Sequence, residues 1–571
     1  MPKDPKGEGN VRRSTPGPCV SALVSLATTL ILAVSRLAGA TTINANSASQ
    51  SDVAAAIASA TNGDVVSIPV GTVTWTRTLA VRKGITLEGA GIGVTIIKDA
   101  VQSGKLIQWT LAAGAAARLT GIEFQDGGRI NGAGPPSGVL HVDGSNTDGS
   151  MFRWDHCKWN NVNGSPVFDT VIGVVDHNTF YVARNSIMFY VYGSNWDGQG
   201  PYGDGSWHDP AGFGSSQFLF FEDNTFTFNV GGLGTISDAY AGARFVVRHN
   251  TIHDGVLNNH GTESTGRTRG GRAYEAYNNI FAGSGWNKYL AGCRSGTMLF
   301  HDNTISGYWG NNATCGLGNY RTHMTFVPFG GADGANPWDF NEPGGPFFTG
   351  TAAANSVGTS VTVTGASWNT DQWKGYSIRK LTNVGNLNTA TFALINGNTS
   401  NVINYCDNGG YSIPSLAFTA GDTLEIRKIR HVLDGIGRGR GSLVSGNPPT
   451  VPSGWNDQVT EPCYSWSNVI ADGVAGAKAN FGDVDLSIRI NEHYFNNTPM
   501  PGYTPYTYPH PLTKGLPPPE QTTRNATANS QHNPLKKRQP WGGKEIDKKK
   551  AKKAKASPTN ETADGRENLG D

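Results

Sequence analysis

The sequence predicts an all-β fold in which short parallel strands stack into a solenoid, a parallel β-helix. The first observation is the composition: 75 of the 571 residues are Gly, 16% are charged, and 10% are aromatic. Disordered chains have few aromatic residues and many charges, so most of this chain is expected to fold. The second is a series of short β-branched runs between Gly-rich turns, a pattern typical of strands. The third is a motif that recurs along the chain, as expected for stacked repeats.

The first 40 residues have the features of a signal peptide. Arg12 and Arg13 precede an apolar run over residues 20–34, and residues 38–40 supply an A-x-A cleavage site. The run is short for a membrane span. We therefore predict a secreted protein, extracellular or periplasmic, without stable membrane insertion. An uncleaved signal anchor is the alternative.

The fold is expected to begin with a helical cap. Residues 53–60 are apolar with helical spacing, and Ser51 or Asp52 is placed to cap the helix. Strand-like runs follow, for example residues 65–69 and 95–97. A stack of repeats needs such a cap, because its first rung otherwise exposes an apolar end.

The recurring motif is an apolar residue, two polar residues, Asn, Thr and another apolar residue. Its anchor positions are Cys157 in the weakest copy, then Asn178, Asn224, Asn250, Asn279 and Asn303. Each rung needs a sharp bend, and Asn tolerates the left-handed conformation that a bend favours. We expect the anchors to adopt that conformation and to form one internal column in which Asn side chains bond along the stack. Helical repeats are disfavoured because the motifs lack helical periodicity.

Two stretches resemble right-handed β-helix proteins of the pectate lyase superfamily. Residues 64–71 (DVVSIPVG) and 119–124 (LTGIEF) are similar to the beginning of such proteins, and the recurring motifs are similar to their rungs. The resemblance covers roughly residues 42–325, and residues 502–512 resemble the ending of secreted bacterial members. It implies a right-handed parallel β-helix. It does not specify the reaction, because the superfamily includes lyases, hydrolases, epimerases and non-catalytic adhesins.

The repeats define the expected domain boundaries. The β-helix is predicted over residues 41–327, where the motifs stop, and residues 328–438 are predicted to form a small inserted β-rich subdomain. Residues 463–470 resemble the motif again. A β-helix continuation and a C-terminal cap are therefore predicted over residues 439–512.

Residues 513–571 are predicted to be a disordered basic tail, because they offer almost no core material. From Leu535 onward there are 11 Lys and Arg against 6 Asp and Glu, so the rest carries 46 − 11 = 35 basic and 44 − 6 = 38 acidic residues. The folded part therefore has no bulk charge signal for nucleic acid.

Five cysteines lie outside the signal segment: Cys157, Cys293, Cys315, Cys406 and Cys463. An odd number without a C-x-x-C pair argues against a zinc site or a dense disulfide framework. One disulfide bridge is an alternative, and Cys293 and Cys315 are the nearest pair in sequence. Buried thiols that fill the core are the alternative.

The second position of each motif is expected to face outward, because alternate residues of a strand face opposite sides. Stacked rungs then place side by side Asp155, Asp176, Glu222, Arg248, Tyr277 and His301. Arg248 is a candidate for substrate binding. A solvated polar stripe is the alternative.

The resemblance also implies where a sugar chain binds. Enzymes of the superfamily bind sugar along the first of three sheets, which follows each Asn bend. By that mapping the first-sheet segments are residues 186–193, 235–241, 257–263 and 288–294. They carry the densest ionisable cluster of the folded part: Asp238, Tyr240, His260, Glu263, Lys288 and Arg294, with Arg267, Arg269 and Arg272 in the loop after His260.

Two chemistries suit this cluster. A uronate lyase needs cations to neutralise the substrate carboxylate and a base to remove the adjacent proton. Arg294, Arg267 or Arg269 can neutralise, and His260 or Lys288 can act as the base, while Tyr240, Arg248 and Arg272 are further candidates for substrate binding. A hydrolase needs two carboxyl groups around the bond, for which Asp238 and Glu263 are candidates. A salt-bridge network between rungs is the structural alternative.

The excess of Arg and His favours a secreted lyase that cleaves an acidic polysaccharide. A glycoside hydrolase is the second reading, and a non-catalytic adhesin that binds glycans through Trp and Tyr is the third. The sequence shows no motif that matches the clustered Asp calcium site of pectate lyases. Calcium stays open as a cofactor without assigned ligands, and the oligomeric state is not predicted.

Overall fold

The protein is described by a computed structural model. The described residues are 40–132, 138–145, 147–184, 187–193, 207, 210–230, 234–262, 269–284, 289–309, 314–319, 321, 325, 330–335, 339–342, 344–384, 391–406, 416–440, 458–471 and 479–514. The predicted signal peptide lies outside them, except for Ala40. Within these residues, no helix has the length and apolar character needed to cross a membrane.

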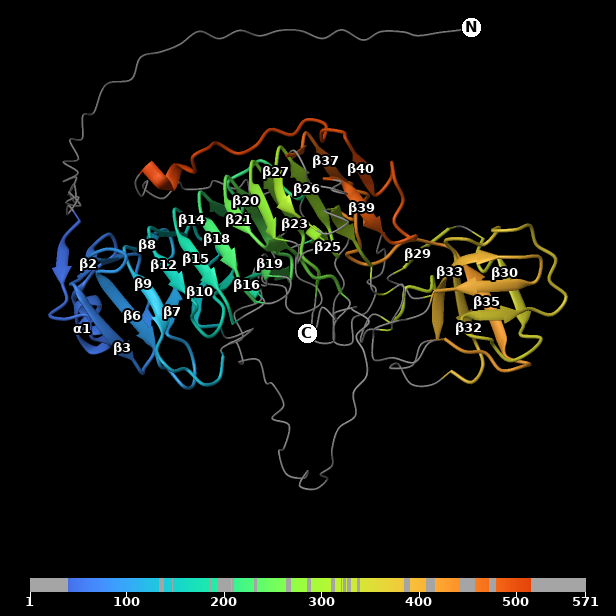
Figure 1. The fold of residues 1–571 in the computed structure, drawn as a ribbon, viewed down its shortest axis with the longest axis horizontal. Coiled ribbons are helices and arrows are strands. Elements are labelled where there is room, and N and C mark those ends of the chain that lie inside the picture. The colour runs from blue at the N-terminus through green and yellow to red at the C-terminus, as the bar shows by residue number, and fades with distance from the viewer. Residues whose placement is uncertain are drawn as a thin grey trace, which may run out of the picture. The chain divides into compact units, whose positions relative to one another are not determined.

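Three long parallel sheets form a right-handed parallel β-helix, which confirms the predicted fold class (Figure 1). Each turn of the chain adds one strand to each sheet, so successive strands of a sheet are about three elements apart in sequence. We call the sheets A, B and C. The strands of sheet A, in order, are β1 (Thr42–Asn44), β2 (Val65–Ile68), β5 (Thr86–Gly89), β8 (Ala116–Thr120), β11 (Met151–Asp155), β14 (Gly173–Asp176), β17 (Leu219–Glu222), β20 (Arg244–Arg248), β23 (Ala273–Tyr277), β26 (Thr297–His301), β37 (Cys463–Trp466) and β40 (Tyr494–Asn496).

Between β2 and β39, each strand of sheet A is followed by one strand of sheet B and one of sheet C, apart from the inserted sheet. Sheet B consists of β3 (Gly71–Trp75), β6 (Thr95–Asp99), β9 (Glu123–Asp126), β12 (Lys158–Asn160), β15 (Thr179–Val182), β18 (Thr225–Phe228), β21 (Thr251–His253), β24 (Ile280–Ser284), β27 (Thr304–Tyr308) and β38 (Val469–Ile470). Sheet C consists of β4 (Leu79–Val81), β7 (Ile107–Thr110), β10 (Leu140–Asp143), β13 (Val167–Asp169), β16 (Ile187–Tyr192), β19 (Gly234–Tyr240), β22 (Gly255–Leu257), β25 (Tyr289–Cys293), β28 (Thr314–Leu317) and β39 (Phe481–Val484).

The Asn anchors form the predicted internal column at the bend between sheets A and B. The backbone N–H of Asn224 donates to the Asn250 side-chain oxygen at 2.9 Å, and that of Asn250 donates to the Asn279 oxygen at 3.1 Å. The same bond joins Asn279 to Asn303 at 3.0 Å. Each link satisfies buried polar groups of two successive rungs.

One detail of that prediction is wrong. The left-handed conformation belongs to the residue before each anchor, not to the anchor itself: φ is 57° at Asp223, 56° at His249 and 51° at Asp302. The anchors instead contribute their side-chain hydrogen bonds along the column. The bend itself is made by the preceding residue.

The interior of the β-helix is filled with stacked aromatic rings from successive rungs. Phe180 and Phe226 of sheet B stack with centroids 4.9 Å apart, and Phe189 of sheet C stacks on Phe221 of sheet A at 4.7 Å. All four rings are fully buried. Phe180 and Phe226 occupy equivalent positions of adjacent rungs, whereas Phe189 and Phe221 meet from two different sheets, and each pair adds about 0.5–1.5 kcal/mol beyond its buried area.

Helix α1 (Gln50–Ser59) covers the start of the stack, as predicted, and buries Val53, Ala56 and Ile57. Its N-cap is Ser49 rather than Ser51 or Asp52. The Ser49 hydroxyl accepts a hydrogen bond from the Asp52 backbone N–H. Asp52 instead places a negative charge in the first turn, where the helix dipole favours it.

A six-stranded antiparallel sheet lies within the predicted insertion. Its strands are β30 (Phe348–Thr351), β31 (Ser360–Thr362), β32 (Ser377–Lys380), β33 (Phe392–Asn398), β34 (Val402–Tyr405) and β35 (Thr423–Arg427). It has its own apolar core, with Trp373, Ile378 and Ile426 among its members. Strands β29 (Phe340–Asn341) and β36 (Ile429–His431) pair at its base, and β37 then joins β26 in the ladder of sheet A.

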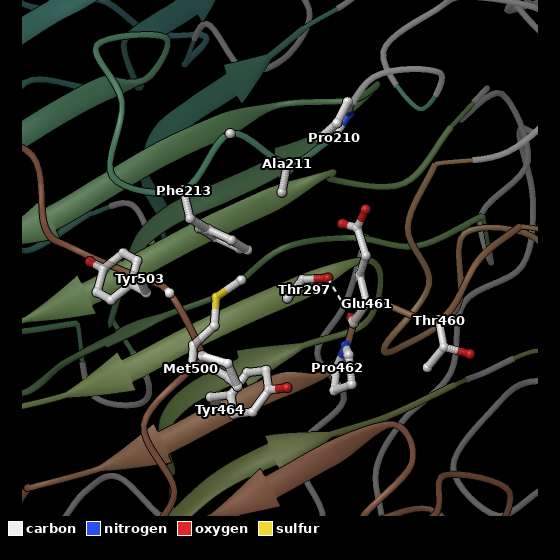
Figure 2. A pocket seen from close by; sticks show the side chains of 13 residues that line it. Pro210, Ala211, Phe213, Thr297, Thr460, Glu461, Pro462, Tyr464, Met500 and Tyr503 are labelled. Carbon is white, nitrogen blue, oxygen red and sulfur yellow. Dashed lines mark hydrogen bonds between the residues drawn. The ribbon is translucent and has the colours of Figure 1, made fainter.

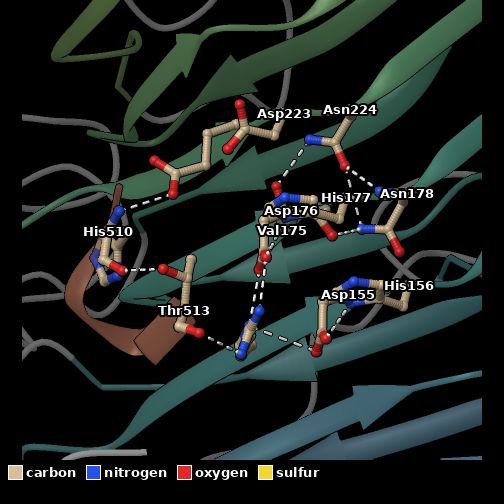
Figure 3. A network of polar contacts seen from close by, with 12 residues as sticks. Asp155, His156, Val175, Asp176, His177, Asn178, Asp223, Asn224, His510 and Thr513 are labelled. Carbon is tan, nitrogen blue, oxygen red and sulfur yellow. Dashed lines mark hydrogen bonds and ion pairs between the residues drawn. The ribbon is translucent and has the colours of Figure 1, made fainter. Parts of the chain in front are cut away.

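The C-terminal segment of the described chain, residues 500–514, runs back over the outer face of sheet A (Figure 1). We call it the C-terminal strap; it ends in the 3₁₀ helix Pro511–Lys514. Arg248 donates to the Tyr506 and Thr507 carbonyl oxygens at 2.7 and 2.9 Å. Figure 3 shows the last contacts, where His510 and Thr513 lie beside the outward residues of sheet A.

The five described cysteines are free thiols, and all but Cys406 are buried. The structure therefore contains no disulfide bridge between Cys293 and Cys315, which the sequence had left as an alternative. Cys315 pairs in register with Ala291, while Cys293 lies opposite Leu317. The core-filling alternative describes these side chains, and burial raises the pKa of Cys157 to about 12.

Candidate functional site

The predicted first-sheet segments coincide with four strands of sheet C. Residues 186–193 contain β16, residues 235–241 overlap β19, residues 257–263 begin at the end of β22, and residues 288–294 contain β25. These strands are consecutive in the sheet. Candidate residues that are distant in sequence are therefore placed on neighbouring strands, about 4.8 Å apart.

Asp238, His260 and Arg294 come together on this sheet. The His260 Nε2 atom lies 2.9 Å from one Asp238 carboxylate oxygen, and an Arg294 guanidinium nitrogen lies 4.0 Å from the other. The exposed fraction of the three side chains is 12% for His260, 4% for Asp238 and 7% for Arg294. The cluster therefore combines an imidazole, a carboxylate and a guanidinium at a mostly buried position that retains limited access from solvent.

The backbone around this cluster is held by Asn259 and Ser295, which sequence reasoning did not select. Asn259 accepts from the Arg294 backbone N–H at 2.8 Å, and its carbonyl oxygen accepts from the Arg294 Nε at 3.0 Å. The Ser295 hydroxyl donates to the His260 carbonyl oxygen at 2.6 Å. Both residues are buried. Their signal in the sequence is weak, because a buried Asn or Ser beside a strand has no fixed spacing to its partners.

Tyr240 belongs to the same surface. Its hydroxyl donates to the Tyr192 hydroxyl at 2.7 Å, and its ring lies edge-on to His260 with centroids 6.2 Å apart. Tyr192, on the neighbouring strand β16, was not predicted. Burial, followed by the neighbouring Tyr240, raises the pKa of Tyr192 above its usual range. The pair extends the cluster along the sheet axis with two hydroxyl groups.

Three predicted site residues, Glu263, Arg267 and Lys288, lie outside the described residues. Of the two carboxylates that the hydrolase hypothesis requires, Asp238 is thus the one within the described residues. The alternative base, Lys288, is likewise not placed.

Arg269 and Arg272 are described, and both are fully buried in structural ion pairs. Arg269 pairs with Asp434 at 2.7 Å, and Arg272 pairs with Glu461 at 2.8 Å. Both guanidinium groups also lie against the ring of Trp207, at 5.6 and 5.2 Å. These ion pairs join distant segments of the chain and match the salt-bridge alternative, while the predicted substrate-binding role of the two residues stays a prediction.

Arg248 lies in a different environment from the one expected for a solvated residue. It faces outward from sheet A, as expected, but it lies on a different sheet from His260 and is covered by the C-terminal strap. Its side chain is fully buried and pairs with Glu222 at 2.6 Å. The Tyr277 hydroxyl lies 2.9 Å away. The outward stripe of sheet A is therefore an interface with the strap at this position rather than a solvated surface, and the substrate-binding role of Arg248 stays a prediction.

A second polar group lies further along sheet C. Ligand atoms of His141, Asp143 and Asp169, from β10 and β13, all lie within 4.8 Å of one another. Gln108 on β7 donates to Asp143 at 2.5 Å. These residues offer two carboxylates and an imidazole to a cation. Calcium prefers oxygen ligands alone, whereas an imidazole suits transition metals, so the donor set does not match calcium well.

No family model matches the chain, and no curated protein matches it. Among solved structures, the chain is similar to the alginate lyase from Paenibacillus sp. str. FPU-7. The identity is 13%, the match covers 51% of this chain and 96% of the other, and the TM-score is 0.23.

Proposed function

We propose that the protein is a polysaccharide-active enzyme that cleaves a uronate-containing glycan by β-elimination at the outer face of sheet C. The observation that supports this proposal is the Asp238–His260–Arg294 cluster, with Tyr240 beside it. Elimination needs a proton acceptor next to a cation that neutralises the substrate carboxylate. The cluster contains both within one set of contacts.

Each residue of the cluster has a role in this proposal. Arg294 pairs with the uronate carboxylate, and Asp238 orients the imidazole of His260 and stabilises it when it becomes charged. His260 removes the proton α to the carboxylate, and the bond from the β carbon to the glycosidic oxygen breaks. The electrons of the broken C–H bond form a carbon–carbon double bond. The leaving oxygen takes a proton from the imidazolium, so His260 is regenerated.

Hydrolysis is the less favoured reading. It needs two carboxyl groups that flank the bond, and within the described part of the cluster Asp238 is the one carboxylate. The His and Arg that contact Asp238 fit an elimination better, because both supply positive charge where an enolate forms.

Screening acidic and neutral polysaccharides with two detection methods tests the proposal. Elimination produces both new reducing ends and ultraviolet absorbance from the conjugated double bond. Hydrolysis produces reducing ends alone, and a non-catalytic adhesin produces neither. A His260→Ala protein prepared in the same way serves as the background. Reducing ends without absorbance would replace the lyase proposal with the hydrolase, and binding without any products would indicate an adhesin.

Secretion is part of the same proposal and rests on residues 1–40 of the sequence. Mass spectrometry of protein collected outside producing cells tests it. A mature N-terminus near Thr41 is expected. Full-length protein retained in the cell membrane would instead support the signal-anchor alternative.

A further inference from the structure

A cavity of about 390 Å³ lies on the outer face of sheet A, on a different sheet from the His260 cluster (Figure 2). Its floor contains Thr297 of β26 and Tyr464 of β37. One wall is the segment 210–213, and the other is the beginning of the C-terminal strap at residues 500–503. The cavity lies between these two covering segments.

Both walls are fixed to one buried carboxylate, that of Glu275 on β23. The Gly214 backbone N–H donates to one of its oxygens at 2.9 Å, and the Tyr503 hydroxyl donates to the other at 2.5 Å. Glu275 is 1% exposed. Because a single rigid strand holds both segments, the cavity is preformed and a ligand does not have to order its walls.

The lining is largely aromatic and apolar. Phe213, Tyr464, Met500 and Tyr503 line the cavity and are all half-buried. Tyr464 is held by a ring stacked on it from the next strand, Phe495, with centroids 5.1 Å apart. The cavity therefore presents flat apolar surfaces with fixed orientation.

Glu461 adds a hydrogen-bond acceptor to this lining, and Figure 2 shows its carboxylate beside the wall formed by Pro210 and Ala211. One carboxylate oxygen pairs with the buried Arg272 at 2.8 Å, so the charge of Glu461 is balanced within the protein. The side chain is still 24% exposed. The backbone oxygen of Glu461 is fixed separately by the Thr297 hydroxyl at 2.7 Å.

We propose that this cavity binds a neutral sugar ring and is a second carbohydrate site of the protein. Sugar C–H faces pack against aromatic faces, whose electron-rich surface attracts the slightly positive hydrogens. Sugar hydroxyls donate to carboxylate and hydroxyl oxygens such as those of Glu461 and Tyr464. A uronate is disfavoured, because its carboxylate would lie close to the Glu461 carboxylate and the lining residues of the cavity include no Lys or Arg.

The second site differs from the sheet C cluster in charge preference. Arg294 suits an acidic sugar at the proposed catalytic face, whereas the cavity suits neutral units. The inference does not depend on the proposed reaction, since the cavity is formed by sheet A, segment 210–213 and the strap. If both sites engage one polymer, that polymer contains neutral and acidic units.

Binding of defined oligosaccharides to the full-length protein tests the inference. The ligands are neutral pentasaccharides of β-1,4-linked glucose, xylose and mannose, and a galacturonate pentasaccharide is the acidic comparison. Calorimetry and saturation-transfer NMR measure their binding. We expect at least one neutral ligand to bind. Tyr464→Ala is expected to weaken it roughly tenfold, the size of one strong aromatic contact.

Matched variants separate the two sites. Tyr464→Phe keeps the ring and should retain most of the affinity, while Thr460→Trp, at an exposed lining position, should block binding by filling the space. His260→Ala should bind the neutral ligand as the unmodified protein does. The cavity variants should in turn leave turnover of short acidic substrates unchanged.

The inference is overturned if the folded protein binds none of the neutral pentasaccharides at millimolar concentration. It is also overturned if folded Tyr464→Ala and Thr460→Trp proteins bind them unchanged. Binding of a hydrophobic dye that the sugars do not displace would assign the cavity to an apolar ligand instead. Retained neutral-sugar binding in a protein that cleaves no polysaccharide would refute the proposed reaction and leave the second site intact.

Discussion

The His260 Nε2 atom lies 2.9 Å from the Asp238 carboxylate, although the two residues come from successive rungs of the β-helix. Asp238 lies in β19, and His260 follows the short strand β22. The His260 backbone N–H donates to the Ala239 carbonyl oxygen at 2.7 Å, which holds the chain after β22 against β19. The side-chain pair therefore depends on the stacking of rungs, and the His260 backbone remains fixed when its side chain is removed.

His260→Ala is expected to reduce turnover about 10²–10⁴-fold, the usual contribution of a general acid or base. The melting temperature should change little, because the backbone bonds of residue 260 are retained. His253→Ala, at an exposed position on sheet B, is the control and should alter neither quantity. Normal turnover in folded His260→Ala protein would contradict the assignment.

Arg248→Met is expected to destabilise the protein by about 3–5 kcal/mol, because it leaves the buried Glu222 without its counter-charge. Chemical denaturation measures this loss. Turnover per folded molecule should be unaffected, since Arg248 lies on sheet A under the strap. Arg184→Ala, which removes an exposed pair with Asp126, should cost at most about 1 kcal/mol. A large loss of substrate affinity in Arg248→Met would support its predicted binding role.

Two truncations distinguish the tail from the strap. A chain that ends at Lys514 is expected to unfold at the same temperature as the full-length protein, because the contacts of Thr513 with Arg153 and His510 are kept. A chain that ends at Pro499 loses the strap. It also loses the hydrogen bonds that the strap makes to the charged groups of Arg248 and Glu222, each worth about 1.5–3 kcal/mol. Equal melting temperatures for the two truncated chains would show that the strap adds no stability.

Acidification is expected to weaken the strap through His510. Burial, followed by the positive charges of Arg248 and Arg153, lowers the pKa of His510 from 6.5 to about 3. Because the folded-state pKa is depressed, the unfolded chain binds more protons between these values. The stability that His510 contributes is therefore full above pH 6.5 and falls as pH decreases toward 3, by about 2 kcal/mol at pH 5.

Hydrogen exchange of strap amides at pH 7.5 and pH 5, corrected for intrinsic rates, measures this effect. His510→Asn is the control, since it keeps an acceptor for the Leu512 N–H but does not titrate. Glu222 accepts a hydrogen bond from the His510 N–H, and burial raises the pKa of this carboxyl group. The stability that Glu222 contributes is therefore lost as pH rises, which is opposite in sign to the effect of His510. The difference between the two proteins therefore isolates His510. Equal pH dependence in both would exclude it as the cause.

The column of Asn residues could be predicted because it follows from a periodic pattern, and the resemblance to β-helix proteins then implied the sheet on which His260 lies. Asn224, Asn250 and Asn279 repeat at nearly constant spacing, so their alignment fixes the register of every rung between them. Asp238 and Arg294 could be placed once that register was known. Asp238 lies in β19 and Arg294 follows β25, with β22 between them, so their approach to 4.0 Å also depends on the reach of the Arg294 side chain.

The contacts that could not be predicted join segments without a shared period. Arg269 meets Asp434, and Arg248 meets the strap at Tyr506, across long stretches of sequence. Sequence alone could identify these arginines as outward or in a loop, but it could not show what covers them. The His141 group was missed for a related reason, because its rungs precede the first Asn anchor.

Strand β37 pairs with β26 in parallel register although more than 160 residues separate Leu299 from Tyr464. Closing a chain segment of this length by diffusion costs entropy, and the cost rises with segment length. The antiparallel sheet within that segment has its own core, and Phe340 pairs with His431 at its base. When this sheet forms first, its two ends are already adjacent and the chain segment that remains to be closed is shorter. Folding of the inserted sheet should therefore precede, and accelerate, the addition of the last rungs.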